Sequence, residues 1–364
     1  MTVTFAEKLA RMPGYKAGVP TGQAPESIAA AGIAQLASNE SSFPPHPAVV
    51  EAIQRAAAAM NRYPDPDATL LRRRIAERYE TEPGRVAVSN GSCEILLAAA
   101  EALAEPGAEI VYAWPSFSMY PYLPALTGAR EIRVPLAEGD VHDLDAMAAE
   151  VTAATQLAIV CNPNNPTATH IPAAEIGAFL ERIPSHVTVI LDEAYVEFQT
   201  NDDPDQSLDL LADHPNLVVL RTFSKCYGLA GLRVGYAIGS AAFRAAVDAV
   251  RQPFSVNALA QAAGAEAILH QDDVLRRVEA TVAERLRVEE GLAQLGLRTS
   301  ESQANFSWVE LGDADEAEIV AGLGERLIAV RPGTPLGDPG HIRVSYGTAA
   351  ENDRFLAAMA ELLD

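Results

Sequence analysis

Short β-rich runs alternate with helical segments from about residue 86 onward, and this rhythm limits what the chain can fold into. The run "RVAVS" leads through the turn "NGS" into the amphipathic helix pattern "CEILLAAAEALAEPG". Strand patterns recur at "EIVYA", "REIRVPL", "QLAIVC", "VTVILDEAY", "NLVVLRTFSK" and "RVGYAIG". Apolar runs such as "VTVIL" suit strands that are buried on both faces. The sequence therefore predicts an α/β fold with a mostly parallel central sheet sandwiched by helices.

The rhythm changes after Pro253. A long helical pattern follows, which we expect to form two helices with a break near residues 271–272. The strand patterns "QANFSWVEL", "LIAVRP" and "HIRVSYG" and a final helix then predict a smaller α+β domain. A chain of 364 residues exceeds the usual size of one core. We therefore expect an N-terminal segment (1–44) that packs with the small domain, a large domain (45–252) and a small C-terminal domain (253–364).

The charge balance excludes several classes of partner. Acidic residues outnumber basic ones by 49 to 27, a net charge of −22, which argues against nucleic acid and anionic membranes. No apolar run is long enough to span a membrane, and the first residues lack a signal-peptide pattern. The three cysteines have no CxxC spacing and the histidines form no metal motif, so we expect a cytoplasmic protein without a metal.

The stretch "SKCYGLAGLR" places Lys225 directly after a predicted strand, where ligands bind in such sheets. A lysine at a strand end is usually a surface residue. Here Thr222, Ser224 and Arg233 offer two hydroxyls and a guanidinium, which suit a phosphate. A buried lysine amine forms Schiff bases with aldehydes. Pyridoxal 5′-phosphate (PLP) carries both an aldehyde and a phosphate, and would explain the whole stretch.

PLP chemistry needs an acidic partner for the ring nitrogen, and Asp192 ends the buried strand pattern "VTVILDEAY". An unpaired carboxylate there would be costly to desolvate, whereas a pyridinium would compensate it. A structural Asp that caps a turn is the ordinary alternative. Tyr195 follows three residues later and could donate to the phenolic oxygen of the cofactor.

Three further turns follow predicted strands. In "CNPNNPTA", Asn165 could bind the same phenolic oxygen, although Asn-Pro repeats alone signify only a turn. In "NGSCE", the N–H groups of Ser92 and Cys93 begin a helix and could cradle a phosphate. In "WPSFSMYP", Phe117 could stack on the pyridine ring, or simply pack.

Taken together, "TFSKCYGLAGLRVGY", "LDEAYVEF", "CNPNNPTA", "NGSCE" and "NRYPD" resemble the PLP-dependent aminotransferases of fold type I. The match is closest to the histidinol-phosphate aminotransferases and their sister aromatic amino acid (phenylalanine) aminotransferases. It covers almost the whole chain, from "PGYKAG" to "HIRVSYGTAAEND".

The resemblance implies a role for each motif. Lys225 would hold the cofactor and move the substrate proton, with Asp192 on the ring nitrogen, Tyr195 and Asn165 on the ring oxygen, and Phe117 stacked on the ring. The phosphate would be held by Ser92, Cys93, Thr222, Ser224 and Arg233. Tyr63 of "NRYPD" would reach the phosphate of a neighbouring subunit, which implies a homodimer. Arg343 would bind the substrate carboxylate; Arg331, Asn39 and Tyr15 complete the expected substrate-binding residues.

The chain departs from the family pattern at three places. Cys93 stands where the family often has Asp, and Cys226 stands where Ala is usual. The common Asn-Glu-Asn-Pro reads "NESS", with Asn39 retained, and this favours the aromatic subgroup.

We therefore expect ping-pong transamination from an aromatic amino acid to 2-oxoglutarate. Histidinol phosphate is the alternative donor. Arg331 lies near Arg343 in the sequence and could bind a substrate phosphate or a distal carboxylate. A PLP-dependent decarboxylase or C–S lyase could use the same frame. A non-catalytic regulator would need an added DNA-binding segment, for which neither length nor acidity leaves room.

Overall fold

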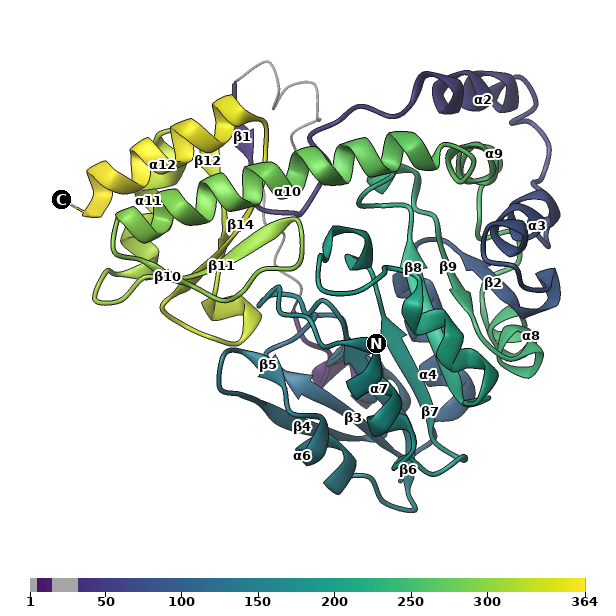
Figure 1. Ribbon diagram of the computed structural model, residues 1–364. Coiled ribbons are helices and arrows are strands. Elements are labelled where there is room, and N and C mark those ends of the chain that lie inside the picture. The colour runs from purple at the N-terminus through teal and green to yellow at the C-terminus, as the bar shows by residue number, and fades with distance from the viewer. Residues whose placement is uncertain (1–4, 15–31, 364) are drawn as a thin grey trace, which may run out of the picture.

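The computed structural model describes residues 5–14 and 32–363, and its centre is an eight-stranded sheet (Figure 1). Its strand order is β2-β9-β8-β7-β6-β3-β4-β5. The five strands from β8 to β4 are parallel, whereas β9 and the edge strand β5 run antiparallel to their neighbours. The mostly parallel sheet is thus confirmed. The strands are β2 (Val86–Ser89), β3 (Glu109–Trp114), β4 (Arg130–Ala137), β5 (Val141–His142), β6 (Thr155–Cys161), β7 (Thr188–Asp192), β8 (Leu217–Thr222) and β9 (Gly235–Ile238).

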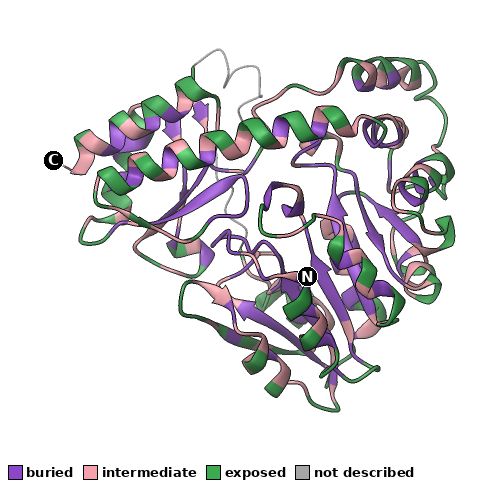
Figure 2. Ribbon diagram, viewed as in Figure 1, coloured by how far each residue is buried: buried purple, intermediate pink, exposed green. Residues whose placement is uncertain are grey.

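Helices cover both faces of this sheet because its strands are apolar on both sides. In β7, Val189 and Leu191 face one apolar core and Ile190 faces the other. Figure 2 shows the central strands buried while the helices expose their outer faces. The helices of this part are α2 (Pro47–Ala57), α3 (Thr69–Arg78), α4 (Ser92–Leu103), α5 (Tyr122–Thr127), α6 (Leu144–Ala149), α7 (Ala173–Leu180), α8 (Ala241–Val250) and α9 (Ala258–Ala267).

A second, four-stranded antiparallel sheet has the order β10-β11-β14-β13. With three helices it encloses a third apolar core, which includes Leu292, Leu323 and Phe355. This is the smaller α+β unit that the sequence predicts. Its elements are α10 (Gln271–Gln294), β10 (Arg298–Thr299), β11 (Phe306–Glu310), α11 (Glu316–Glu325), β13 (Arg331–Pro332), β14 (His341–Ser345) and α12 (Ala349–Leu363).

The run "LIAVRP", expected as one strand, is divided between two sheets. Its first part, β12 (Ile328–Ala329), pairs in parallel with β1 (Ala34–Gln35), and its second part is β13. The pairing attaches the N-terminal segment to the small unit. Short 3₁₀ helices complete the chain: η1 (Glu7–Ala10), η2 (Pro83–Arg85), η3 (Val196–Phe198), η4 (Gln206–Ala212), η5 (Ala230–Leu232) and η6 (Thr334–Leu336).

The two expected helices are present, but the break between them lies at residues 268–270, just before the expected 271–272, because α9 ends at Ala267 and α10 begins at Gln271. Helix α10 then runs across the molecule to the small sheet (Figure 1). Buried side chains between Val256 and Val274 pack with the core of the large sheet. The expected domain limits at residues 44 and 252 stay predictions. Within the described ranges, no helix has the length and apolar character that a bilayer crossing requires.

Candidate active site

A cavity of about 340 Å³ opens where β6, β7 and β8 end, and the small unit supplies part of its wall. This is the edge at which open α/β sheets bind ligands. It brings together the predicted residues Asn39, Ser92, Cys93, Phe117, Asn165, Asp192, Tyr195, Thr222, Ser224, Lys225, Arg233, Arg331 and Arg343. Of the other two, Tyr15 lies outside the described residues and Tyr63 lies elsewhere on the surface.

Lys225 reaches the cavity from the turn after β8, and it is one of three lysines in the sequence. Its Nζ donates to the carbonyl oxygen of Ser38 at 3.2 Å. Burial lowers the pKa of Lys225 to about 8, and the nearby Arg343 guanidinium acts in the same direction. The amine is therefore more often neutral than an exposed lysine at physiological pH. A neutral amine is what nucleophilic attack on a carbonyl requires.

Asp192 ends β7 and is 3% exposed. Its Oδ2 accepts a hydrogen bond from Tyr120 Oη at 2.9 Å, while Oδ1 is buried with no hydrogen-bond partner among the described residues. Burial raises the pKa of Asp192 to about 6, against the opposing effect of the Tyr120 hydrogen bond. A buried carboxylate oxygen without a donor is costly, so this atom calls for a donor or a cation in the cavity.

The start of α4 and the turn after β8 form one end of the cavity. Ser92 is the first residue of α4, where backbone N–H groups lack intrahelical acceptors. Arg233 Nη1 lies 3.5 Å from Ser224 Oγ, which also accepts from Thr222 Oγ1 at 3.0 Å. Gly91 has φ +78°, and a Cβ there would lie 2.4 Å from Arg233 Nη2. The glycine thus lets the guanidinium approach the helix start, and the two together favour an anion.

Tyr195 stands at the centre of a hydrogen-bonded group that joins the two units. Its Oη accepts from Asn39 Nδ2 at 3.0 Å and from Asn165 Nδ2 at 3.5 Å. Arg343 donates to Asn165 Oδ1 and, at 2.7 Å, to the carbonyl oxygen of Ala37. Burial raises the pKa of Tyr195 to about 12, against the opposing effect of Arg343. The phenol therefore stays protonated and can donate.

Asn39 is fixed to the small sheet. Its backbone N–H donates to Ser345 Oγ at 2.8 Å, and Ser345 Oγ donates back to Asn39 Oδ1 at 2.9 Å. Its φ of +53° is a left-handed conformation that Asn tolerates better than most residues. The irregular N-terminal segment is thereby carried into the cavity wall.

Sequence reasoning missed several residues of this wall. They are Ser38, Glu40, Ser118, Cys161 and Leu336, together with Tyr120 behind Asp192. Tyr120 and Ser118 carried a signal, because both lie in the "WPSFSMYP" segment that follows a predicted strand, and Cys161 opens the "CNPNNPTA" motif at the end of β6. Ser38, Glu40 and Leu336 come from the N-terminal segment and the β13–β14 loop, whose positions depend on the packing of the small unit.

Tyr63 lies outside the cavity and is 83% exposed. Its ring stacks on Phe254 at a centroid distance of 4.7 Å. An aromatic residue this exposed within one chain is compatible with a role at a partner's site, and that role stays a prediction.

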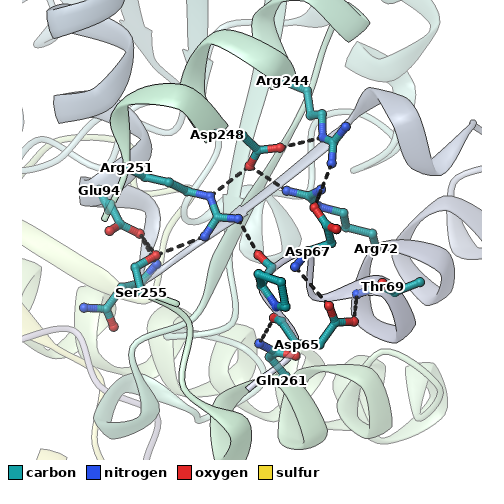
Figure 3. Close-up of polar contacts among 12 residues, drawn as sticks. Asp65, Asp67, Thr69, Arg72, Glu94, Arg244, Asp248, Arg251, Ser255 and Gln261 are labelled. Atoms are coloured by element: carbon teal, nitrogen blue, oxygen red, sulfur yellow. Dashed lines mark hydrogen bonds and ion pairs between the residues drawn. The ribbon is translucent and has the colours of Figure 1, made fainter. Parts of the chain in front are cut away.

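A partly buried charge network holds the backbone between Asp65 and Asp67, close in sequence to Tyr63 (Figure 3). Asp248 pairs with Arg72 at 2.7 Å, with Arg244 at 2.7 Å and with Arg251 at 2.8 Å. Arg251 also donates to the carbonyl oxygen of Pro66 at 2.8 Å and to Ser255 Oγ at 3.2 Å. The segment that carries Tyr63 is thus tied to the end of α8.

The same network continues to the start of α4 (Figure 3). Glu94 Oε2 accepts from the backbone N–H of Asn90 at 2.6 Å and from Ser255 Oγ at 2.9 Å. The turn before the anion-binding end of the cavity is therefore fixed by the segment that follows α8.

The cavity combines an anion-binding end, a carboxylate oxygen that lacks a donor and a buried amine of lowered pKa. These features fit the phosphate, the protonated ring nitrogen and the aldehyde of PLP. An aldehyde-bearing cofactor would use the amine, and a protonated ring nitrogen would complete Asp192.

Comparisons with known proteins agree with this chemistry. The family model "Aminotransferase class I and II" matches residues 31–359. An aromatic amino acid aminotransferase from Thermobifida fusca is 46% identical over 347 residues, covering 94% of this chain and 92% of that protein. One from Streptomyces coelicolor is 42% identical and covers 94% and 95%.

Solved structures give the same result. The structure of histidinol-phosphate aminotransferase from Sinorhizobium meliloti in complex with PLP superposes with a TM-score of 0.88 at 30% identity, covering 100% of this chain and 98% of that one. A tetra mutant of Thermus thermophilus aspartate aminotransferase shares the fold, with a TM-score of 0.84 at 24% identity and coverage of 99% and 100%.

Proposed function

This chain belongs to the class I and II aminotransferases, which depend on PLP, and we propose that it transfers the amino group of phenylalanine or tyrosine to 2-oxoglutarate. The observation that carries the proposal is the similarity, at 42% and 46% identity over nearly the whole chain, to aminotransferases named for aromatic amino acids. The two half-reactions use one site in turn, so that site must accept both an aromatic ring and a second carboxylate.

Different residues of the cavity would bind different groups of the cofactor. Arg233, Ser224, Thr222 and the N–H groups of Ser92 and Cys93 would hold the cofactor phosphate, because a helix start and a guanidinium both favour an anion. Asp192 would pair with the protonated ring nitrogen through its otherwise unsatisfied Oδ1. Tyr195 and Asn165 would donate to the ring oxygen, and Phe117 would cover the ring face.

PLP, when bound, withdraws electrons from the substrate Cα and accepts its amino group. Lys225 Nζ takes the proton from Cα and returns it, since its lowered pKa gives the amine a larger neutral fraction than an exposed lysine has while it stays basic. Arg343 holds the α-carboxylate with its planar fork, which fixes Cα near Nζ. Arg331 would bind the distal carboxylate of 2-oxoglutarate, and Asn39 and Tyr15 would complete the substrate contacts.

The enzyme would be a cytoplasmic homodimer. A homodimer would bring the exposed Tyr63 of one subunit to the phosphate end of the other. The three free cysteines favour a cytoplasmic enzyme.

Histidinol phosphate is a second candidate donor, because the structure that matches with a TM-score of 0.88 is a histidinol-phosphate aminotransferase. In that case Arg331 would bind the substrate phosphate. The test is kcat/KM for phenylalanine, tyrosine and histidinol phosphate, each with 2-oxoglutarate. We expect phenylalanine or tyrosine to be preferred. A preference for the phosphate ester by orders of magnitude would reverse the assignment. A failure to form pyridoxamine phosphate with any amino donor would support decarboxylase or lyase chemistry.

A further inference from the structure

The hairpin that carries both substrate-facing arginines also places a large aliphatic side chain in the cavity. Arg331 on β13 and Arg343 on β14 are paired across the two strands. The loop between these strands contains Leu336, which lines the cavity and is 3% exposed. The proposed carboxylate binder and this apolar side chain therefore belong to one small structural unit.

The lining residues leave few candidates for contact with an aromatic substrate side chain. Among the described ones, Phe117 and Leu336 are the large side chains without a polar atom, and the others are alanines, polar or charged residues, a tyrosine and two cysteines. Phe117 comes from the large unit and is the expected stacking partner of the cofactor. Leu336 comes from the small unit, on the same hairpin as the residue that would hold the substrate.

The loop that carries Leu336 is held in place by a carboxylate. Glu316, at the start of α11, accepts from the backbone N–H and from Oγ1 of Thr334, each at 3.0 Å. It also accepts from the N–H of Gly340 at 2.8 Å. Both ends of the loop thus attach to one side chain, and the N–H of Leu336 donates to the carbonyl oxygen of Gly333 at 2.7 Å. A loop fixed in this way presents its side chains without further ordering cost.

The same loop rests against the large unit. Gly337 has φ +105°, and a Cβ there would lie 2.5 Å from Nε1 of Trp114 at the end of β3. Only glycine allows this approach. Leu336 is therefore fixed between an anchor on α11 and a contact on the large sheet.

We propose that Leu336 determines specificity for the aromatic ring of the amino donor, and that Glu316 is a positioning residue that acts through Leu336. The inference rests on the proposed function and names the side chain that selects its substrate class. A 2-oxoglutarate molecule carries a charged group in place of the ring, so Leu336 contributes little to its binding.

The test is equilibrium binding of two unreactive probes to the holoenzyme by isothermal titration calorimetry. 3-Phenylpropionate carries the side chain and carboxylate of phenylalanine, and glutarate stands for 2-oxoglutarate. Leu336→Ala should weaken 3-phenylpropionate by about 10- to 100-fold, since it removes several carbons from an apolar pocket. The affinity of Leu336→Ala for glutarate should differ from that of the wild type by less than about threefold. The affinity of Leu336→Met for 3-phenylpropionate should also stay within about threefold of the wild-type value.

A double-variant cycle tests the role of Glu316. Glu316→Ala should weaken the binding of 3-phenylpropionate. The double variant Glu316→Ala/Leu336→Ala should bind it no more weakly than Leu336→Ala does, because Glu316 acts through Leu336. Glu318→Ala is the matched control, since Glu318 is exposed on the same helical turn. Retained glutarate affinity shows that each variant is folded.

The outcomes separate the two proposals. If the wild type neither binds 3-phenylpropionate nor transaminates phenylalanine, the proposed function is wrong and the inference falls with it. If the wild type transaminates phenylalanine but Leu336→Ala binds both probes like the wild type, the inference alone is overturned.

Discussion

At the scale of single residues, burial changes the pKa values of Lys225 and Asp192 and thereby their reactivity. Lys225 and Asp192 would both be charged and unremarkable in water, with ordinary pKa values near 10.5 and 3.8. Removal from water disfavours the charged form of each, so the pKa of the amine falls and the pKa of the carboxyl rises. The two residues therefore suit a ligand that offers an aldehyde to the amine of Lys225 and a positive charge to the carboxylate of Asp192.

Replacement of Lys225 gives the first prediction. Lys225→Ala should lower the transamination rate by a factor on the order of 10³ or more, because the proton shuttle is lost. With PLP added, the wild type should be yellow and bleach with phenylalanine, whereas the variant should not bleach. The visible absorption spectrum records the yellow colour and its bleaching in both proteins. Lys8→Ala, at an exposed lysine, is the control and should behave like the wild type.

Asp192 gives a prediction on stability without cofactor. Its folded pKa of about 6 exceeds the ordinary 3.8, so the folded state binds more protons between these values. The contribution of Asp192 to the unfolding free energy should therefore fall as pH rises from about 4 to 6, by an amount on the order of 2 kcal/mol, and stay low above that. Asp192→Asn should lack this contribution, so its unfolding free energy should decrease by about that much less than that of the wild type. Denaturant titrations of both apo proteins at pH 4.5 and 7.5 measure it, and equal changes in the two proteins would contradict it.

At the scale of elements, the positions of the strand ends and of one helix start organise the site. Strands β6, β7 and β8 end beside one another because they are parallel neighbours, so Asp192 at the end of β7 and Asn165 and Lys225 in the turns after β6 and β8 reach one cavity. Helix α4 begins at the same edge, and Gly91 lets Arg233 lie against its first turn. The anion-binding end is therefore a property of two elements in contact.

Replacement of Gly91 tests this contact. Gly91→Ala should raise the Kd for PLP by about tenfold or more, since the new Cβ must displace the Arg233 guanidinium and occupies a left-handed backbone position. The Kd is measured by absorbance titration of the apo protein. Gly84→Ala is the control, because a Cβ at Gly84 would meet no atom within 4 Å. Equal Kd values for the Gly91→Ala variant and the wild type would show that PLP binding does not require the close approach of Arg233 to Gly91.

At the scale of the whole molecule, one chain encloses a cavity yet leaves a candidate site residue on its surface. Tyr63 is exposed, although Arg251 holds the neighbouring backbone through Pro66 and Phe254 stacks on the ring. An exposed aromatic ring on a fixed backbone suits a contact with a second subunit. The proposed dimer would use it to complete each site with a residue of the partner.

A mixing experiment tests this arrangement. Lys225→Ala and Tyr63→Ala should each be impaired, and a refolded mixture should recover roughly a quarter of wild-type activity, because mixed dimers contain one intact site. Lys225→Ala mixed with Asp192→Asn is the control, since both residues line the cavity of the same chain and cannot complement each other. A first mixture no more active than its separate components would exclude a shared site.

The sequence alone determined the alternation of strands and helices, the parallel sheet and the motif residues that follow its strands. These features are local, because a buried strand must be apolar and a turn needs its particular residues. The tertiary structure decided the rest: the division of "LIAVRP" between two sheets, the hydrogen bonds of Asn39, and the places of Tyr120 and Leu336 in or behind the cavity wall. Each depends on contacts between residues far apart in the chain, and no local pattern encodes such a contact.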